Sequence, residues 1–332
     1  MSAAESPPAR THARSLLADA AERYALLAVW GITIVIFGIL RPDTFLTTSN
    51  FTTIFGSQAI LVVLTLALLV PLTAGDYDLS VAATMGLSSM TLAILNVNHG
   101  WSIWLAVLAA LAVGLAVGLI NGALVVLLDI DSLIATLGTS TFIAGVILWI
   151  SNSQTISGIS DSLINIVVVD QWLGIPLEFY YGIALGLVML YVFEFTPVGR
   201  RLLFVGRGRG VARLSGIRVP RLRWGAFAVS GVISAFGGVL YAGTLGSADP
   251  TSSLSFLLPA FAAAFLGATT IVPGRFNPIG SIAAVYFLVT GITGLQLLGV
   301  QTFVQQLFYG TALVLAVALS QFARRRDARA AE

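Results

Sequence analysis

The sequence predicts an all-α integral membrane protein with about ten transmembrane helices. Of its 332 residues, 57% are hydrophobic and only 10% are charged, which leaves too little polar surface to cover a soluble globule of this size. Apolar runs of about the 20 residues that a bilayer requires recur along the whole chain. The chain is therefore expected to be solvated by lipid, with little room for a separate soluble domain.

The arginines predict how these helices are oriented. All 17 basic residues are Arg, and eight of them lie between Gly199 and Arg223 with no acidic residue among them. Short loops rich in Lys and Arg stay on the cytoplasmic side of a membrane. The loop 196–223 is therefore predicted to be cytoplasmic, and it sets the direction of every span before and after it.

Ten apolar runs are the predicted spans of a transmembrane domain over residues 24–322. If the tail 1–23 is cytoplasmic, five crossings place the segment 151–179 outside, where it carries acidic residues and no Arg. Five more crossings return the tail 323–332 to the cytoplasm, and the two halves then have the topology of an inverted repeat. Arg41 is the only arginine predicted to lie outside. The runs are 24–40, 57–73, 79–97, 103–127, 133–150, 180–195, 224–245, 254–272, 279–298 and 303–322.

The stretch Pro71–Ser80 interrupts the apolar region between the second and third spans with Pro, Gly and two carboxylates. Asp78 suits a helix N-cap, because a carboxylate accepts hydrogen bonds from the free amides of a first turn. Irregular backbone at membrane depth is also tolerated where it lines a water-filled route, so Asp76, Asp78 and Ser80 are candidates for a translocation path. An aspartyl protease is not favoured, because both carboxylates share one turn.

Within the basic loop, Gly208–Ile217 has the pattern of a short amphipathic helix closed by Gly216. Val211, Leu214 and Ile217 would share one face at three-residue spacing. The segment could serve as a topology anchor or could dock onto a cytoplasmic partner. A nucleic-acid partner is not favoured, because no aromatic residue is interleaved before Trp224.

The fourth span carries Gly114, Gly118 and Gly122 at four-residue spacing. Small residues at this spacing allow close helix packing, either within one subunit or between subunits. Asn121 lies beside the last of these glycines, where an interhelical hydrogen bond is a commoner role than substrate binding.

Several chemistries are not supported by any motif. The chain has no Lys and therefore no phosphate-binding loop of the Gly-x-x-x-x-Gly-Lys type, no His-Glu-x-x-His and no Gly-x-Ser-x-Gly. It has no Cys and two His, which makes a metal site improbable. No carboxylate lies near the middle of a span, so a proton-coupled or sodium-coupled carrier lacks support. We predict no enzyme activity, no metal and no cofactor bound by this chain.

Several motifs point to a known family. Arg213-Leu-Ser-Gly-Ile217 is followed by Ser230-Gly231 and Gly237-Gly238, and Asp78-Leu-Ser-Val81 precedes them. With these motifs the chain resembles, over nearly its whole length, the permease subunits of bacterial ATP-binding-cassette importers for ribose, xylose and related sugars or sugar alcohols. It departs from the family pattern at Asp76 and Tyr77, where Gly-Ile is usual, and at Val272–Pro278, where Pro replaces a flexible Gly.

The resemblance implies a multi-pass protein of the bacterial cytoplasmic (inner) membrane that moves a monosaccharide or sugar alcohol. Its implied partners are a second permease copy or homologue, ATPase subunits that use ATP and Mg, and an extracytoplasmic solute-binding protein. The alternatives are a related permease for branched-chain amino acids or nucleosides, and a stand-alone secondary transporter.

The resemblance also assigns residues. The coupling helix to the ATPase would comprise Gly210, Val211, Ala212, Arg213, Leu214, Ser215, Gly216 and Ile217. Beyond the turn residues named above, the groups expected to line the path are Asn121, Thr136, Thr139 and Ser140.

Overall fold

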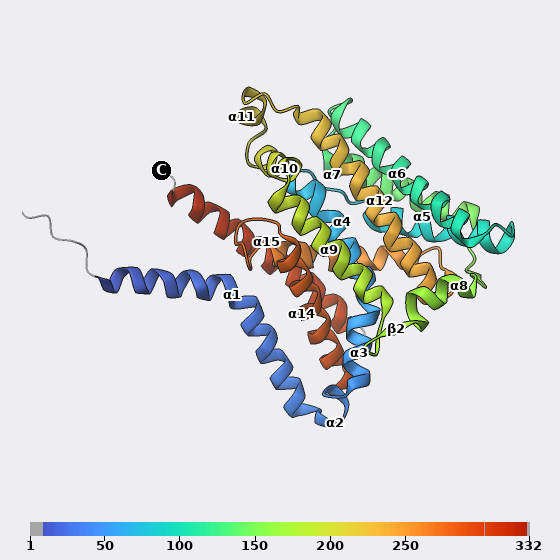
Figure 1. Cartoon of the computed structure of the whole chain (residues 1–332), viewed down its shortest axis with the longest axis horizontal. Helices are drawn as coiled ribbons and strands as arrows, with labels where there is room; N and C mark the ends of the chain where they lie inside the picture. The colour runs from blue at the N-terminus through green and yellow to red at the C-terminus, as the bar shows by residue number, and fades with distance from the viewer. Residues whose placement is uncertain (1–8, 302, 331–332) are drawn as a thin grey trace, which may run out of the picture.

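The computed structural model describes residues 9–301 and 303–330, and within them the side chains of 23–56, 58–301 and 303–318. The chain forms a bundle of helices (Figure 1). In the described part, eight helices are long and apolar enough to cross a membrane, and shorter apolar helices cover Ser252–Gly267 and Phe303–Ala318. Together they correspond to the ten predicted runs. The prediction of an all-α integral membrane protein is therefore confirmed.

The bounds of the elements are as follows. The long helices are α1 (Ala9–Leu40), α4 (Ala59–Thr73), α5 (Val81–Ala93), α6 (Ile103–Val126), α7 (Ser132–Ile150), α9 (Leu177–Phe195), α12 (Val219–Leu245), α13 (Leu257–Gly267), α14 (Pro278–Leu297) and α15 (Phe303–Ala330). The short elements are α2 (Pro42–Phe45), α3 (Thr48–Ser57), η1 (Ile94–Asn98), β1 (Ile156–Ser157), α8 (Asp161–Ile164), η2 (Asn165–Val169), β2 (Gln171–Trp172), β3 (Ile175–Pro176), α10 (Pro197–Arg207), α11 (Arg209–Leu214), β4 (Ser247–Ala248) and η3 (Ser252–Phe256).

Some helices extend beyond the apolar runs. Helix α1 begins at Ala9, within the predicted tail, and α15 continues to Ala330. Helix α12 begins at Val219 rather than at residue 224, because Pro220 is compatible with the first turn of a helix. Arg221 and Arg223 therefore belong to the start of a long buried helix and not to a loop.

Helix α4 is the centre of the bundle. All fifteen of its residues are buried, and it packs against α5, α9, α12, α13 and α14. A helix that is apolar on every side must be enclosed by others. By contrast, α6 and α7 expose large apolar side chains such as Leu108, Phe142 and Trp149, which suits a lipid-facing surface. The structure thus separates an enclosed core helix from helices with exposed apolar faces.

Glycines bring α6 and α12 into close contact. A Cβ atom added to either Gly114 or Gly231 would collide with the backbone of the other helix. The Trp224 indole nitrogen donates to the Leu119 carbonyl oxygen at 3.0 Å across the same seam. The glycines predicted from spacing contact α12 of their own subunit: Gly114 meets Gly231, Gly118 meets Phe227, and Gly122 meets Trp224.

The polar segment 151–179 folds back onto the bundle. Strand β1 pairs antiparallel with β4, and β2 pairs with β3 in a hairpin. Leu163 and Val167 are buried beside Gly243 of α12. Next to β4, hydrogen bonds from the Ser252 hydroxyl and the Thr251 amide hold the pKa of Asp249 well below its usual range. This segment is therefore a folded cap on one end of α12.

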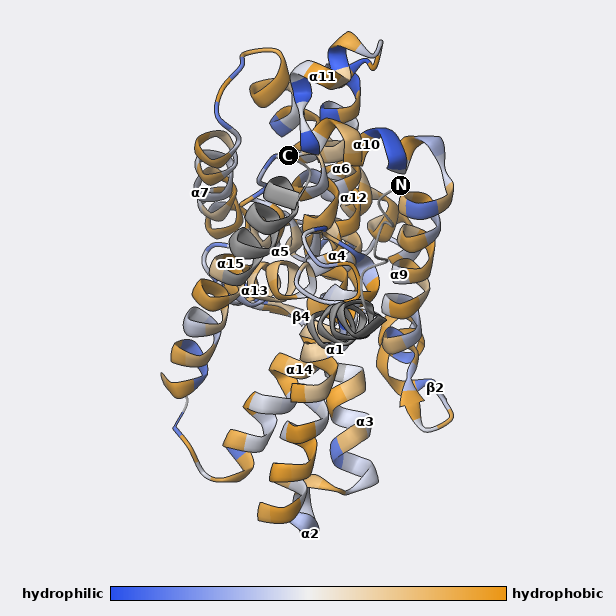
Figure 2. Ribbon diagram, turned by 90° about the vertical axis from the view of Figure 1, so that its left-hand side faces the viewer, coloured by the Kyte–Doolittle hydropathy of each residue, from blue (hydrophilic) through white to orange (hydrophobic). Residues whose placement is uncertain are grey.

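Helices α10 and α11 project from the opposite end of the bundle, where hydrophilic residues gather (Figure 2). In Figure 1 the end of α15 and the beginning of α1 lie toward this same end, whereas α2 and β2 lie toward the other. The described parts of the two tails and the basic loop thus share one side of the bundle. That this side is the cytoplasmic one stays a prediction from the arginine distribution.

We predict that Gly231→Val destabilises the protein by about 1–3 kcal/mol, because the new side chain would force α6 away from α12. Thermal unfolding in detergent measures the effect. Gly145→Ala is the control, since a Cβ there meets nothing within 4 Å. Equal unfolding temperatures for the two variants would contradict the close α6–α12 contact.

Candidate coupling site

The turn between α4 and α5 begins with a Schellman motif. The Gly75 amide donates to the Leu72 carbonyl at 3.1 Å, and the Asp76 amide donates to the Pro71 carbonyl at 3.0 Å. Gly75 has φ +77°, a left-handed conformation that glycine adopts without steric cost. Pro71 lies inside the last turn of α4, so Gly75, not the proline, ends the helix. This geometry places the Asp76 side chain directly beneath the basic loop.

Asp76 is the charged centre of the site. Its carboxylate is 2% exposed and accepts two hydrogen bonds from Arg223, at 2.8 and 2.7 Å. Arg209 donates to the same carboxylate at 2.7 Å and to the Gly75 carbonyl at 2.8 Å. Arg209 is the first residue of α11, and Arg223 lies in α12. One buried carboxylate therefore joins the α4–α5 turn, the short loop helix and a core helix.

Asp78 anchors the other side of the turn. Its carboxylate accepts the Ser80 amide at 3.0 Å, the Ser80 hydroxyl at 2.6 Å and the Ser230 hydroxyl at 2.9 Å. Burial raises the pKa of Asp78, and the hydrogen bonds from Ser80 and Ser230 oppose that rise. The N-cap position of α5 is Ser80, so Asp78 lies two residues before it and not at the cap itself. Asp78 thus ties the start of α5 to α12.

Two further helices hold the turn. Asn121 of α6 donates from its amide nitrogen to the Ser80 hydroxyl at 2.7 Å, the interhelical bond expected of it. On α7, the Thr136 hydroxyl accepts the Leu79 amide at 2.9 Å, and the Ser132 hydroxyl accepts the Tyr77 amide at 3.1 Å. The structure therefore brings together five of the residues proposed to line a path, namely Asp76, Asp78, Ser80, Asn121 and Thr136.

The remaining candidates lie further along α7. Thr139 is half-buried, and its hydroxyl donates to the Ala135 carbonyl at 2.9 Å. Ser140 is 7% exposed and lies about one turn beyond Thr136. The structure gives neither of them a hydrogen bond to the α4–α5 turn. A role of all seven residues in the path stays a prediction, and the contacts show that five of them hold helices together.

The predicted coupling helix is α11, but it is shorter than expected. It spans Arg209–Leu214, and Ser215–Ile217 form its closing turn. Gly216 has φ +78°, and the Ile217 amide donates back to the Ala212 carbonyl at 3.1 Å, a second Schellman motif. The glycine stop was predicted correctly.

The exposed apolar side chains of α11 are Val211 and Leu214, which are 60% and 91% exposed. Ala212 is fully buried against Val205 of α10 and Val219 of α12. Ile217, expected on the same face as Leu214, packs instead against this buried cluster. The reason is that α11 ends before Gly216 and the chain then turns inward, so Ile217 no longer follows the three-residue spacing of the helix.

Sequence reasoning missed α10, the helix that supports α11. The signal was present in Thr196-Pro197: the Thr196 hydroxyl accepts the Gly199 amide at 3.2 Å, and Pro197 occupies the first helical position. Gly206 near its end lies so close to Thr73 that a Cβ would collide with the Thr73 carbonyl. Helix α10 therefore rests directly on the end of α4.

The fold and this site define a polytopic membrane subunit whose exposed loop helix is tied to its core. The chain belongs to the family described as branched-chain amino acid transport system, permease component, which it matches over residues 26–317. This match confirms the resemblance to importer permeases drawn from the motifs. No solved structure gives a significant match.

Three relatives are informative. The D-allose transport system permease protein of Escherichia coli is 30% identical over 300 residues, which cover 90% of this chain and 92% of that protein. The L-arabinose transport system permease protein of Escherichia coli is 28% identical and covers 92% of both chains. The autoinducer 2 import system permease protein of Salmonella paratyphi B is 29% identical over 80% of this chain and 76% of its own length.

We predict that Arg223→Gln destabilises the protein by about 3 kcal/mol, because it leaves a buried carboxylate without its bidentate partner. Arg209→Gln should cost less than about 1 kcal/mol, because Arg209 is 44% exposed and water can replace it. Denaturant unfolding in detergent micelles compares the two. A larger loss for Arg209→Gln would contradict the assignment of Arg223 as the main counter-ion.

Proposed function

We propose that this chain is the membrane subunit of an ATP-binding-cassette importer in the bacterial cytoplasmic membrane, and that it carries a monosaccharide or a closely related polyol inward. The observation that carries the proposal is the exposed apolar pair Val211 and Leu214 on a short helix anchored to the core. An apolar side chain that is 91% exposed in a basic, hydrophilic loop suits a protein partner. Family membership supports an ATPase as that partner.

The proposed assembly follows from this assignment. Two copies of the chain, or this chain and a homologue, would enclose the path, and two partner subunits would bind ATP and Mg. An extracytoplasmic binding protein would deliver the solute. This chain would supply no catalytic residue of its own; its part in the cycle would be mechanical.

The contacts of Arg209 suggest how movement would pass through the chain. A displacement of α11 by the ATPase would pull on Asp76 through Arg209, and Asp76 is bonded in turn to Arg223. The α4–α5 turn would then move together with α12, because both elements hold the same carboxylate. Since α4 is enclosed by five helices, a shift of its end would repack the bundle around it.

The relatives favour a sugar as the solute. D-Allose and L-arabinose appear in the names of two of them, and both compounds are neutral, polyhydroxylated monosaccharides. The family description names branched-chain amino acids instead, which are zwitterions. A permease for an amino acid is therefore the second candidate, and uptake assays with both classes of solute separate the two.

We predict that the tagged wild-type chain, purified from gently solubilised membranes, brings an ATPase subunit with it. Leu214→Asp should weaken this association about tenfold, because it places a charge in an apolar contact. The spans should remain folded, since Leu214 contacts little of its own chain. Quantitative mass spectrometry of the co-purified protein measures the loss.

Arg218→Gln is the control, because Arg218 is exposed and lies outside the predicted coupling helix. Normal association and normal uptake by Leu214→Asp would contradict the docking role of α11. Uptake by the purified chain alone, without ATP, would replace the importer with a secondary transporter.

A further inference from the structure

A large, open cavity with a mixed polar and apolar lining lies far from α11, between α13, α14, α15, η3 and the junction of α3 with α4. Its volume is about 750 Å³, within the range of sites that bind small molecules. The polar side chains that line it come from η3, α14, α15 and the α3–α4 junction: Gln58, Ser255, Thr293, Gln296, Gln305 and Gln306. None of the residues that coupled the α4–α5 turn to α11 is among them.

The chemistry of the lining is neutral. Of the fourteen residues around the cavity, none is Asp, Glu, Arg or His. Amide and hydroxyl groups both donate and accept hydrogen bonds, as the hydroxyl groups of a polyol require. A zwitterion would instead find no counter-ion for its carboxylate or ammonium group, and burying either charge unpaired is costly.

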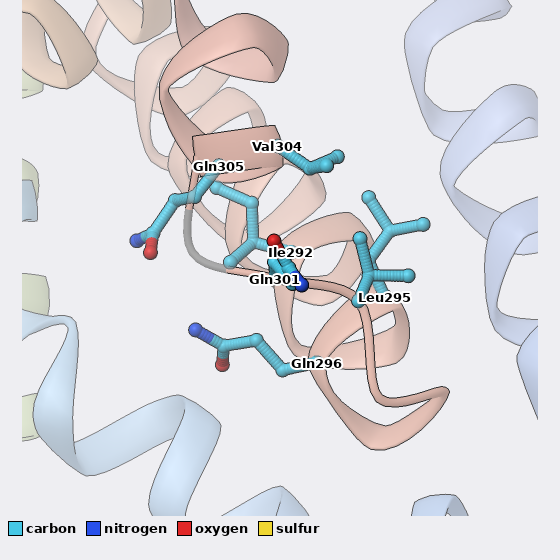
Figure 3. Close-up of a pocket in the computed structure, with 7 residues that line it drawn as sticks. Ile292, Leu295, Gln296, Gln301, Val304 and Gln305 are labelled. Atoms are coloured by element: carbon cyan, nitrogen blue, oxygen red, sulfur yellow. The ribbon is translucent and has the colours of Figure 1, made fainter.

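Two of the glutamines, Gln296 and Gln305, lie close to each other at the edge of the cavity. Gln296 of α14 and Gln305 of α15 also border a smaller adjoining recess, and Figure 3 shows both side chains extending to the same side, away from Leu295 and Val304. Tyr309, one turn beyond Gln305, lines the large cavity as well. Glutamine amides within apolar spans are tolerated where they are bonded or face a water-filled space.

The backbone is interrupted where the cavity meets the core. Residues 48–73 form one candidate membrane span, and its helix is interrupted at Gln58 between α3 and α4. Broken helices at solute sites are a recurring feature of membrane transporters. The break places a polar residue beside Leu61, on the buried helix α4 whose far end carries the Asp76 turn.

We propose that this cavity is the solute-binding vestibule of the permease and that it accepts a neutral polyhydroxylated compound. The proposal rests on the proposed importer function and gives it a site. The junction of α3 with α4 borders the cavity, and Figure 2 shows α3 toward the end of the bundle opposite α11, which the arginine distribution predicts to be extracytoplasmic. A solute would thus enter at one end of α4, and the ATPase would act at the other.

Cysteine labelling tests the site, because the chain has no Cys and any label on the purified chain therefore marks the introduced cysteine. Gln296→Cys and Gln305→Cys are introduced singly into the full complex in whole cells, and a charged, membrane-impermeant methanethiosulfonate is applied from outside. Gln171→Cys, exposed on the β2–β3 hairpin, is the matched control. D-Allose, L-arabinose and leucine are each tested for protection in the presence of the binding protein.

We expect both cavity cysteines to be labelled, uptake to fall on labelling, and the transported sugar but not leucine to slow the reaction. Gln171→Cys should be labelled without protection and without loss of uptake. Gln305→Leu, which removes one hydrogen-bonding group, should lower uptake at limiting solute about tenfold.

Two results would overturn the site. One is absence of labelling at both cavity positions; the other is labelling that leaves uptake unchanged. The unmodified chain separates this failure from a failure of the proposed function. If the unmodified chain takes up sugar with a requirement for ATP, but the cavity cysteines are not labelled or their labelling leaves uptake unchanged, only the proposed site is wrong. If it takes up no sugar at all, or does so without an ATPase, the proposed function is wrong.

Discussion

The buried Asp76 carboxylate constrains the geometry of the whole basic end of the molecule. An ionised carboxylate removed from water is costly unless it is paired and hydrogen-bonded. Here Arg223 supplies a bidentate contact from α12 and Arg209 a further one from α11. The position of the loop helix is thus set by the electrostatic requirement of one residue in a turn between two spans.

Because α4 is enclosed, a movement that reaches it through Asp76 would also move the helices packed around it. A surface helix could absorb a displacement by moving into lipid, but α4 is buried along its whole length. Helix α10 contacts the end of α4 through Gly206, and glycines allow α6 and α12 to pack closely against each other. Close-packed elements of this kind shift as units instead of deforming gradually. The structure therefore offers a mechanical path from an exposed helix to the interior of the bundle.

Much of this could be predicted from local sequence. Hydropathy and arginine distribution predicted the spans because lipid solvation acts on each segment separately. The end of α11 was predictable because Gly216 alone sets it, and the Asn121 bond because a buried amide needs a partner. Ion pairs between residues far apart in the sequence could not be predicted. Asp76 meets Arg209 and Arg223 more than 130 residues later, and nothing local distinguishes these arginines from their neighbours. Gln58 and Gln305 likewise come together only in the folded bundle.

We infer that Asp76 and Arg209 transmit movement from α11 to the spans. The most direct test is the number of solute molecules imported per ATP hydrolysed, measured in proteoliposomes that contain the complete complex. Arg209→Gln should leave assembly and ATP hydrolysis in place but lower this ratio, while Arg218→Gln, an exposed arginine without contact to Asp76, should not. An unchanged ratio for Arg209→Gln would contradict the account.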